Sequence, residues 1–140
     1  MFLLRSTDDG RQQPWEYLPC SEIAPKYGMA MKMSSGTLAQ SGSADGAEYI
    51  SVREEAAALA EGTPIPVVKV LKDQVWQTEV ESTEGLTVGE GYDLDTDGLS
   101  IAATSEGGAC FVVTAVDETT GIVLGRFRDP AAAADDGGEG

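Results

Sequence analysis

The sequence predicts an all-β fold: a single compact β-barrel or sandwich of short antiparallel strands, with an extended N-terminal arm and a flexible acidic C-terminal tail. Apolar and polar residues alternate over short segments, which is the period of a β-strand. Turns that contain glycine interrupt these segments about every 8–12 residues, a spacing typical of sandwiches and barrels. With 140 residues the chain is long enough for one domain. We divide it into an arm (1–27), a β-barrel domain (28–128) and an acidic Ala/Gly tail (129–140).

The arm is expected to be extended and irregular, because three prolines between positions 14 and 25 disfavour a helix and fit poorly in a central strand. It nevertheless carries large apolar side chains, and each aromatic one could bury about 150–250 Å². Such an arm should dock either on its own barrel or on a neighbouring subunit or partner. The candidate partner-binding residues are Phe2, Leu4, Trp15, Tyr17 and Leu18.

In the first half of the barrel domain, strands are expected at 29–33, 37–40 and 48–53. The first of them alternates methionine with Ala30 and Lys32, so the methionines are expected on a core face. Residues 54–61 are the one stretch with helix-favouring composition, but a free helix shorter than ~12 residues is marginal in water. A single helical turn or an exposed loop is therefore expected there.

In the second half, strands are expected at 65–71, 75–81, 92–95, 99–102, 109–117 and 122–127. The first of these is rich in valine, and prolines at its start place that end at a sheet edge. Asp97-Gly98 can supply the positive φ of a tight turn, so the flanking segments form the clearest hairpin. The strand centred on Phe111 is the most apolar. The tail beyond residue 128 contains no basic residue and should be mobile unless a neighbour holds it.

The charge balance is strongly acidic, with 24 acidic against 9 basic residues and a formal net charge of −15. This argues against nucleic acid and against anionic membranes as partners, because both are bound by clustered Lys and Arg. The acidic surface is expected to keep the protein soluble, or to keep free subunits apart until a specific partner is present. Neither a signal peptide nor a run of membrane-spanning length is visible, so synthesis in a cytoplasm is expected.

The residues that most enzymes rely on are scarce in this chain. It has no histidine, which removes the commonest general base, Ser-His and Cys-His pairs and the usual zinc sites. Cys20 and Cys110 are in no metal-binding spacing and are expected to be reduced thiols, with Cys110 in the core. We therefore expect no enzymatic activity, no catalytic residues, no bound metal and no cofactor.

One acidic motif allows a second interpretation. Asp93, Asp95, Asp97 and Gly98 match the opening of a calcium-binding loop, in which alternate oxygens face one cation. The match then fails, because the twelfth position is Thr104 and the flanks are strand-like, so a hairpin turn is favoured. Together with the aromatic residues Trp76 and Tyr92, the motif motivates an alternative function as a calcium-dependent or carbohydrate-binding β-module.

Several short motifs, none of them catalytic, occur between residue 1 and about residue 128. They are FLLR (2–5), PWEYLP (14–19), YGMAMK (27–32), EYI (48–50), PIPVVKV (64–70), LTVG (86–89), DGL (97–99) and RF (126–127). With these motifs the chain resembles the small head-decoration, or capsid cement, proteins of tailed phages and prophages of Gram-positive bacteria.

The resemblance implies a β-barrel subunit on the outer surface of a phage head, made in the cytoplasm of the bacterial host. Such proteins bind the major capsid protein, often as homotrimers at three-fold positions, and clamp adjacent capsid subunits after expansion. They stabilise the capsid by contact area and need no catalytic residue. An extended segment of residues 13–25 would span roughly 40 Å, enough to reach a neighbouring subunit.

Overall fold

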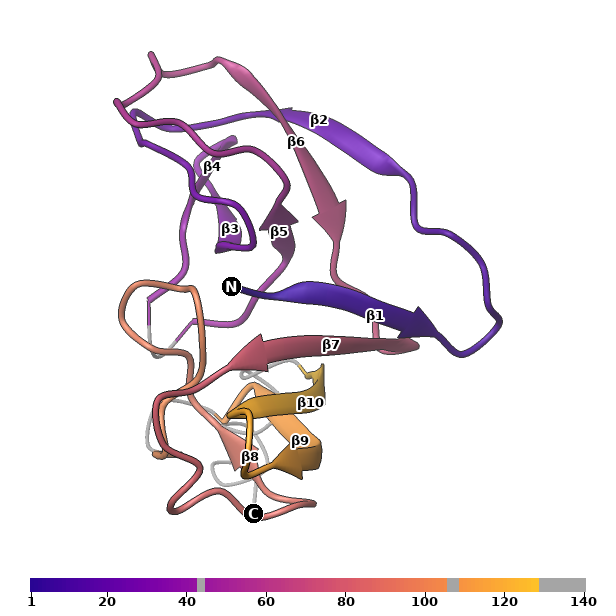
Figure 1. Cartoon of the computed structure of the whole chain (residues 1–140). Helices are drawn as coiled ribbons and strands as arrows, with labels where there is room; N and C mark the ends of the chain where they lie inside the picture. Colours follow the sequence, from indigo (N-terminus) through magenta and orange to yellow (C-terminus); the bar gives the residue numbers. More distant parts are fainter. Residues whose placement is uncertain (43–44, 106–108, 129–140) are drawn as a thin grey trace, which may run out of the picture.

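A computed structural model describes residues 1–42, 45–105 and 109–128. Over these ranges the chain forms ten strands and no helix, which confirms the all-β prediction (Figure 1). The strands are β1 (Leu3–Thr7), β2 (Trp15–Pro19), β3 (Ala30–Ser34), β4 (Thr37–Gln40), β5 (Tyr49–Ser51), β6 (Pro64–Lys69), β7 (Gln74–Glu79), β8 (Gly91–Tyr92), β9 (Phe111–Asp117) and β10 (Ile122–Phe127). The expected flexible tail, 129–140, lies outside the described residues. No described helix is both long enough and apolar enough to cross a membrane.

The strands form two five-stranded antiparallel sheets. Sheet A has the order β1-β7-β10-β9-β8, and sheet B has the order β2-β6-β5-β3-β4. In Figure 1, sheet B forms the upper half of the molecule and sheet A the lower half. Cys20, which directly follows β2, forms a parallel bridge with Leu38 of β4, and the N–H of Ser21 donates to the Leu38 carbonyl at 2.8 Å. This bridge brings the two ends of sheet B together, so that sheet curls around its own interior.

Two groups of buried apolar side chains follow from this arrangement. The larger one lies between the sheets and combines residues of both, among them Phe2, Ile50, Trp76 and Phe127. The smaller one fills the interior of sheet B with Cys20, Met29, Met31, Leu38, Ile65 and Val67. Met29 and Met31 are thus core residues, as the strand period predicted, and Met33 packs against the same group.

The inter-sheet core is built around aromatic rings. The Phe127 ring lies 5.1 Å from that of Phe2, 5.0 Å from that of Phe111 and 6.0 Å from that of Trp76, each in an edge-to-face arrangement. The N–H of Phe2 donates to the carbonyl of Gly28 at 2.9 Å, and a Cβ at Gly28 would lie 2.8 Å from that same nitrogen. With its φ of +77°, Gly28 is therefore the residue that lets the N-terminal segment enter the core.

Contrary to the prediction, the first 27 residues are not irregular throughout, because they contain two strands, β1 and β2. β1 pairs with β7 in sheet A, and β2 pairs with β6 in sheet B over its full length. Pro14 precedes β2 and Pro19 ends it, where an edge strand tolerates proline. The sequence left open whether this segment docks on its own barrel or on a neighbouring subunit. The structure places it on its own chain, because β1 belongs to sheet A and β2 to sheet B.

The structure also decides two local predictions, the helix-like stretch at 54–61 and the Asp97-Gly98 turn. Residues 54–61 form no helix and instead lie against the segment before β3, with the Glu55 and Leu59 N–H groups donating to the carbonyls of Pro25 and Ile23 at 2.9 and 2.8 Å. The Asp-Gly turn is present, since the Gly98 N–H donates to the Asp95 carbonyl at 3.0 Å and Gly98 has a φ of +69°. The segments flanking it pair through a single bridge rather than a full hairpin ladder.

Candidate interaction surface on the edge strands β1 and β2

Two aromatic side chains on β2 are exposed to an unusual degree for their size. Trp15 is 57% exposed and Tyr17 is 65% exposed. Because successive side chains of a strand point to opposite faces, these two residues share one face of sheet B. Large aromatic side chains gathered in this way on an exposed edge are typical of an interaction surface.

The strand register explains why they are exposed. Trp15 stands opposite Val68 of β6, Val68 stands opposite Ile50 of β5, and Ile50 stands opposite Ala30 of β3. Directly opposed residues of antiparallel strands point to the same face. Ala30, Ile50 and Val68 are buried between the sheets. Trp15 and Tyr17 therefore continue the inter-sheet apolar layer onto an edge strand that sheet A does not cover.

A groove of about 520 Å³ lies beside Trp15, between β1 and β2. Its lining includes buried residues of the inter-sheet core, Phe2, Val68 and Trp76, together with the partly exposed Leu4 and Tyr27. β1 and β2 belong to different sheets and lie apart from one another, joined by a connection at one end (Figure 1). The groove is thus the open side of the sandwich, where the apolar layer between the sheets becomes accessible from outside.

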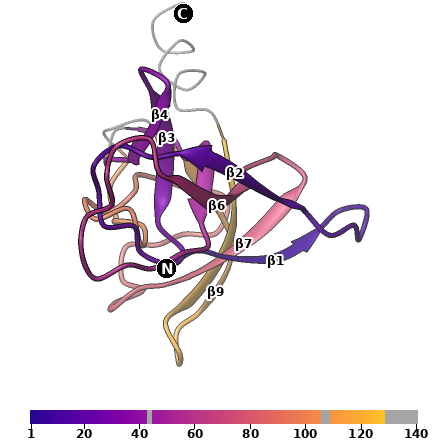
Figure 2. The same ribbon diagram turned by 90° about the horizontal axis from the view of Figure 1, so that it is seen from above.

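The connection between β1 and β2 closes one end of this groove and is held in place by charge. It projects from the body beside the turn between β6 and β7 (Figure 2). The Arg126 guanidinium donates to both carboxylate oxygens of Asp8, at 2.8 and 3.1 Å, and the Asp8 N–H donates to the Asp73 carbonyl at 2.8 Å. The hydrogen bond from Arg126 holds the pKa of Asp8 below its usual value. A two-point contact of this kind fixes direction as well as position.

The five residues predicted to bind a partner do not form one surface. Trp15 and Leu4 line the groove, and Tyr17 lies on the same face of β2 as Trp15. Phe2 lies at the base of the groove but is only 1% exposed and is a central residue of the core. Leu18 points to the opposite face of β2 and packs against the interior of sheet B.

Tyr27 is an additional member of this surface that the sequence did not single out. Its side chain is partly exposed and lines the same groove as Trp15, although 11 residues of chain separate the two aromatics. The one signal in the sequence is that Tyr27 directly precedes Gly28, the glycine that the N-terminal segment approaches closely. Its proximity to Trp15, however, depends on the pairing of sheet B and could not be read from spacing.

The three aspartates of the calcium-like motif serve the local backbone. Asp93 is buried and accepts hydrogen bonds from the Thr104 hydroxyl and the Ala109 N–H, both at 3.0 Å. Asp95 accepts from the N–H of the next residue at 2.8 Å, and Asp97 accepts from the Leu99 N–H at 3.0 Å. Across the part of the chain that the structure describes, no three acidic or cysteine side chains converge as a metal site would require.

The aromatic residues of the alternative binding-module hypothesis are structural. Trp76 is almost fully buried, and its indole N–H donates to the Gln74 side chain at 3.0 Å. Tyr92 is buried, and its hydroxyl accepts from the Thr87 N–H at 2.6 Å and donates to the Gly85 carbonyl at 3.0 Å. Neither ring presents an open face on which a sugar could stack.

Both cysteines are buried free thiols, as expected. Burial, with a smaller contribution from the negative charge of Asp93, raises the pKa of Cys110 to about 12. Because the thiolate is the reactive form, Cys110 is chemically inert at neutral pH. It acts as a small apolar residue of the inter-sheet core.

Comparison with protein-family models, with curated proteins and with solved structures finds no match for this chain.

Proposed function

We propose that this chain is a structural virion protein that binds the outer surface of a phage capsid and stabilises it. The observation that supports the proposal is the exposed aromatic pair Trp15 and Tyr17 beside an open groove, on an edge strand that extends the inter-sheet core. In this role the protein acts through contact area, and the proposal assigns it no catalytic residue. The major capsid protein is the partner, and the site of action is the surface of the virion.

The geometry of the surface suits a rigid contact. Trp15 and Tyr17 project from a strand that is hydrogen-bonded to β6 along its whole length, so little backbone freedom is lost on binding. Many copies on a symmetric shell then turn a modest affinity at each site into a large stabilisation, because every bound copy favours the intact capsid over its separated subunits.

Binding should use side chains rather than added strands. β1 carries a register shift between Leu4 and Ser6, which distorts its free edge. β2 is bracketed by Pro14 and Pro19, and the residue after it is already bridged to β4. Bulges and prolines are the devices by which edge strands resist pairing with other chains. A capsid subunit would therefore meet the aromatic face and the groove, not an open β-ladder.

The assembly state belongs to the same proposal. In line with the resemblance to decoration proteins, we propose that three copies act together at a three-fold position of the capsid. The net charge of −15 opposes association of free copies. Trimers are accordingly expected on the capsid, where contacts with the shell add to those between copies.

The test uses undecorated capsids of the phage that carries this protein. Capsid melting is followed by calorimetry with the wild-type chain, with Trp15→Ala/Tyr17→Ala, and with Val88→Ala as the matched control. Val88 is 58% exposed but lies in the connection between β7 and β8, outside the groove. Wild type and Val88→Ala should raise the melting temperature of the capsid equally, and the double variant should raise it much less.

Two results would count against the proposal in different ways. If the wild-type chain neither binds nor changes capsid melting, the decoration function is wrong. If all three chains stabilise the capsid equally, the function stands but the aromatic face of β2 is not the contact surface.

A further inference from the structure

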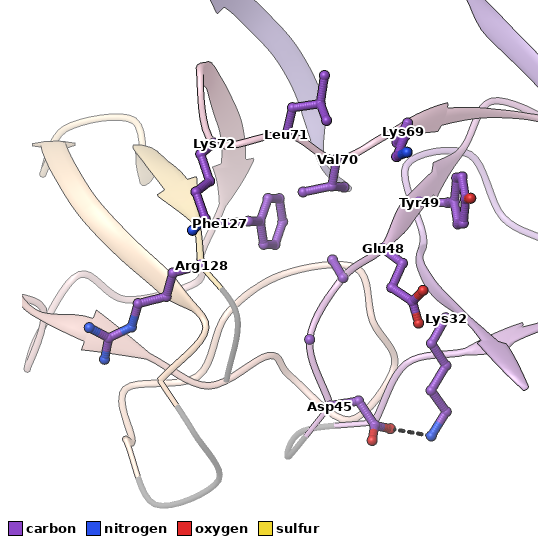
Figure 3. A pocket seen from close by; sticks show the side chains of 12 residues that line it. Lys32, Asp45, Glu48, Tyr49, Lys69, Val70, Leu71, Lys72, Phe127 and Arg128 are labelled. Carbon is purple, nitrogen blue, oxygen red and sulfur yellow. Dashed lines mark hydrogen bonds and ion pairs between the residues drawn. The ribbon is translucent and has the colours of Figure 1, made fainter. Parts of the chain in front are cut away.

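A second groove, of about 710 Å³, lies between the two sheets and gathers most of the lysines of the chain. Three of the four lysines, Lys32, Lys69 and Lys72, line it, and so does Arg128 at the end of β10 (Figure 3). The chain as a whole carries a net charge of −15. Four of the nine basic residues of the chain therefore lie at one groove, which is a candidate site for an anionic ligand.

The cations of this groove are only partly neutralised by neighbouring groups. The Lys32 ammonium forms an ion pair with Asp45 at 2.7 Å, and the Arg128 guanidinium turns away from the other labelled side chains while its Nε donates to the Ala109 carbonyl at 2.8 Å (Figure 3). Among the ion pairs of the described residues, none involves Lys69 or Lys72. Lys69 and Lys72 thus line the groove without an ion pair among the described residues, although a second carboxylate, that of Glu48, lines the groove as well.

The groove also has an apolar part. Val70, Leu71 and Phe127 line it between the lysines, and Tyr49 borders it from β5. A ligand that combines carboxylates with small apolar groups would match both parts of this lining.

We propose that the acidic segment 129–140 of the same chain docks in this groove, with its carboxylates against Lys69 and Lys72. The segment begins directly after Arg128, which itself lines the groove. It carries acidic side chains at 129, 135, 136 and 139, no basic residue, and a run of alanines at 131–134. Charge and composition therefore complement the two parts of the lining.

A tethered segment is a better occupant than a free acidic partner. A separate polyanion would have to approach a protein of net charge −15 against long-range repulsion. The segment 129–140 is already attached at the rim, where tethering supplies an effective concentration on the order of millimolar. Fully extended, it could reach about 40 Å from Arg128. This inference concerns a groove that shares no lining residue with the one beside β2, and it does not rest on the proposed capsid function.

The experiment is zero-length carbodiimide crosslinking of the full chain, followed by peptide mass spectrometry. Lys26 is the internal control, because it is the one exposed lysine outside the groove. Crosslinks from Lys69 and Lys72 to residues 129–140 are expected in several-fold excess over those from Lys26. They should disappear at ~1 M salt, where the Debye length falls to about 3 Å. In a mixture of isotope-labelled and unlabelled protein, the crosslinks should join residues of one chain.

A second experiment replaces the lysines by alanine and follows the NMR signals of the acidic segment. Amide chemical shifts of residues 129–140 should change in Lys69→Ala/Lys72→Ala and stay unchanged in Lys26→Ala; these side chains are exposed, so both variants should fold. The proposal is overturned if Lys26 crosslinks as often as the groove lysines, or if crosslinks join only different chains. It is also overturned if the amide shifts of residues 129–140 are the same in Lys69→Ala/Lys72→Ala as in Lys26→Ala.

Discussion

Phe2 and Trp15 are aromatic residues of the same N-terminal segment, but one is buried and the other is exposed. Phe2 is 1% exposed and contacts the rings of Phe111 and Phe127, whereas Trp15 is 57% exposed on an edge strand. From the sequence, both were candidate partner-binding residues of one extended arm. What separates them is the register of β2 against β6 and the close approach at Gly28, which are both long-range features.

We therefore expect Phe2→Ala to destabilise the fold far more than Trp15→Ala. Removing a buried phenylalanine costs about 3–5 kcal/mol, because the lost transfer energy adds to that of the cavity left behind. Removing a largely exposed side chain should cost about 1 kcal/mol or less. Urea unfolding of the two variants and the wild type measures the difference. Equal losses would mean that Trp15 packs on its own domain more tightly than its exposure indicates.

At the scale of elements, the sequence indicated most strands after residue 28, but neither β1 nor β2, and not the sheet to which each strand belongs. Period-2 alternation is local, so strands such as β7 and β10 could be predicted within a few residues. β8 was predicted as part of a hairpin with 99–102, yet it pairs with β9. Assignment to sheet A or sheet B depends on contacts between distant segments, such as β1 with β7. The candidate surface could be predicted only in part for the same reason.

The ion pair between Asp8 and Arg126 ties the β1–β2 connection to sheet A and should make it sensitive to acid. The pKa of Asp8 is lowered in the folded state, chiefly by the hydrogen bond from Arg126. A lowered pKa means that the stabilisation is present above the usual aspartate value of 3.8 and is lost as the pH falls through the folded value. Asp8→Asn should thus lower the urea midpoint at pH 7, and the difference from wild type should shrink on acidification.

A matched control separates this contact from a general charge effect. Glu118→Gln removes one negative charge from the exposed turn between β9 and β10, far from Arg126 along the sheet. Its urea midpoint should stay at or above that of the wild type, since the chain is already strongly acidic. If Asp8→Asn behaves like this control at every pH, the ion pair does not hold the connection.

At the scale of the whole molecule, the N-terminal segment joins the two sheets. β1 is one of the two outer strands of sheet A, β2 is one of the two outer strands of sheet B, and Phe2 belongs to the core that the sheets share. Cys20 then closes sheet B by bridging to Leu38. A domain with a detachable arm would keep its folded body without that arm. Here the same residues supply an edge to each sheet and part of the core.

We therefore expect a chain that begins at residue 28 to lose cooperative folding. It would lack one outer strand of each sheet, the aromatic ring of Phe2 and the bridge that closes sheet B, so β6 and β7 would each expose a new edge to solvent. Circular dichroism with urea titration, compared with a chain that lacks only residues 129–140, measures the effect and controls for truncation itself. A cooperative transition of unchanged midpoint in the chain from residue 28 would show that residues 1–27 are an accessory arm, and that the body of the protein is complete without them.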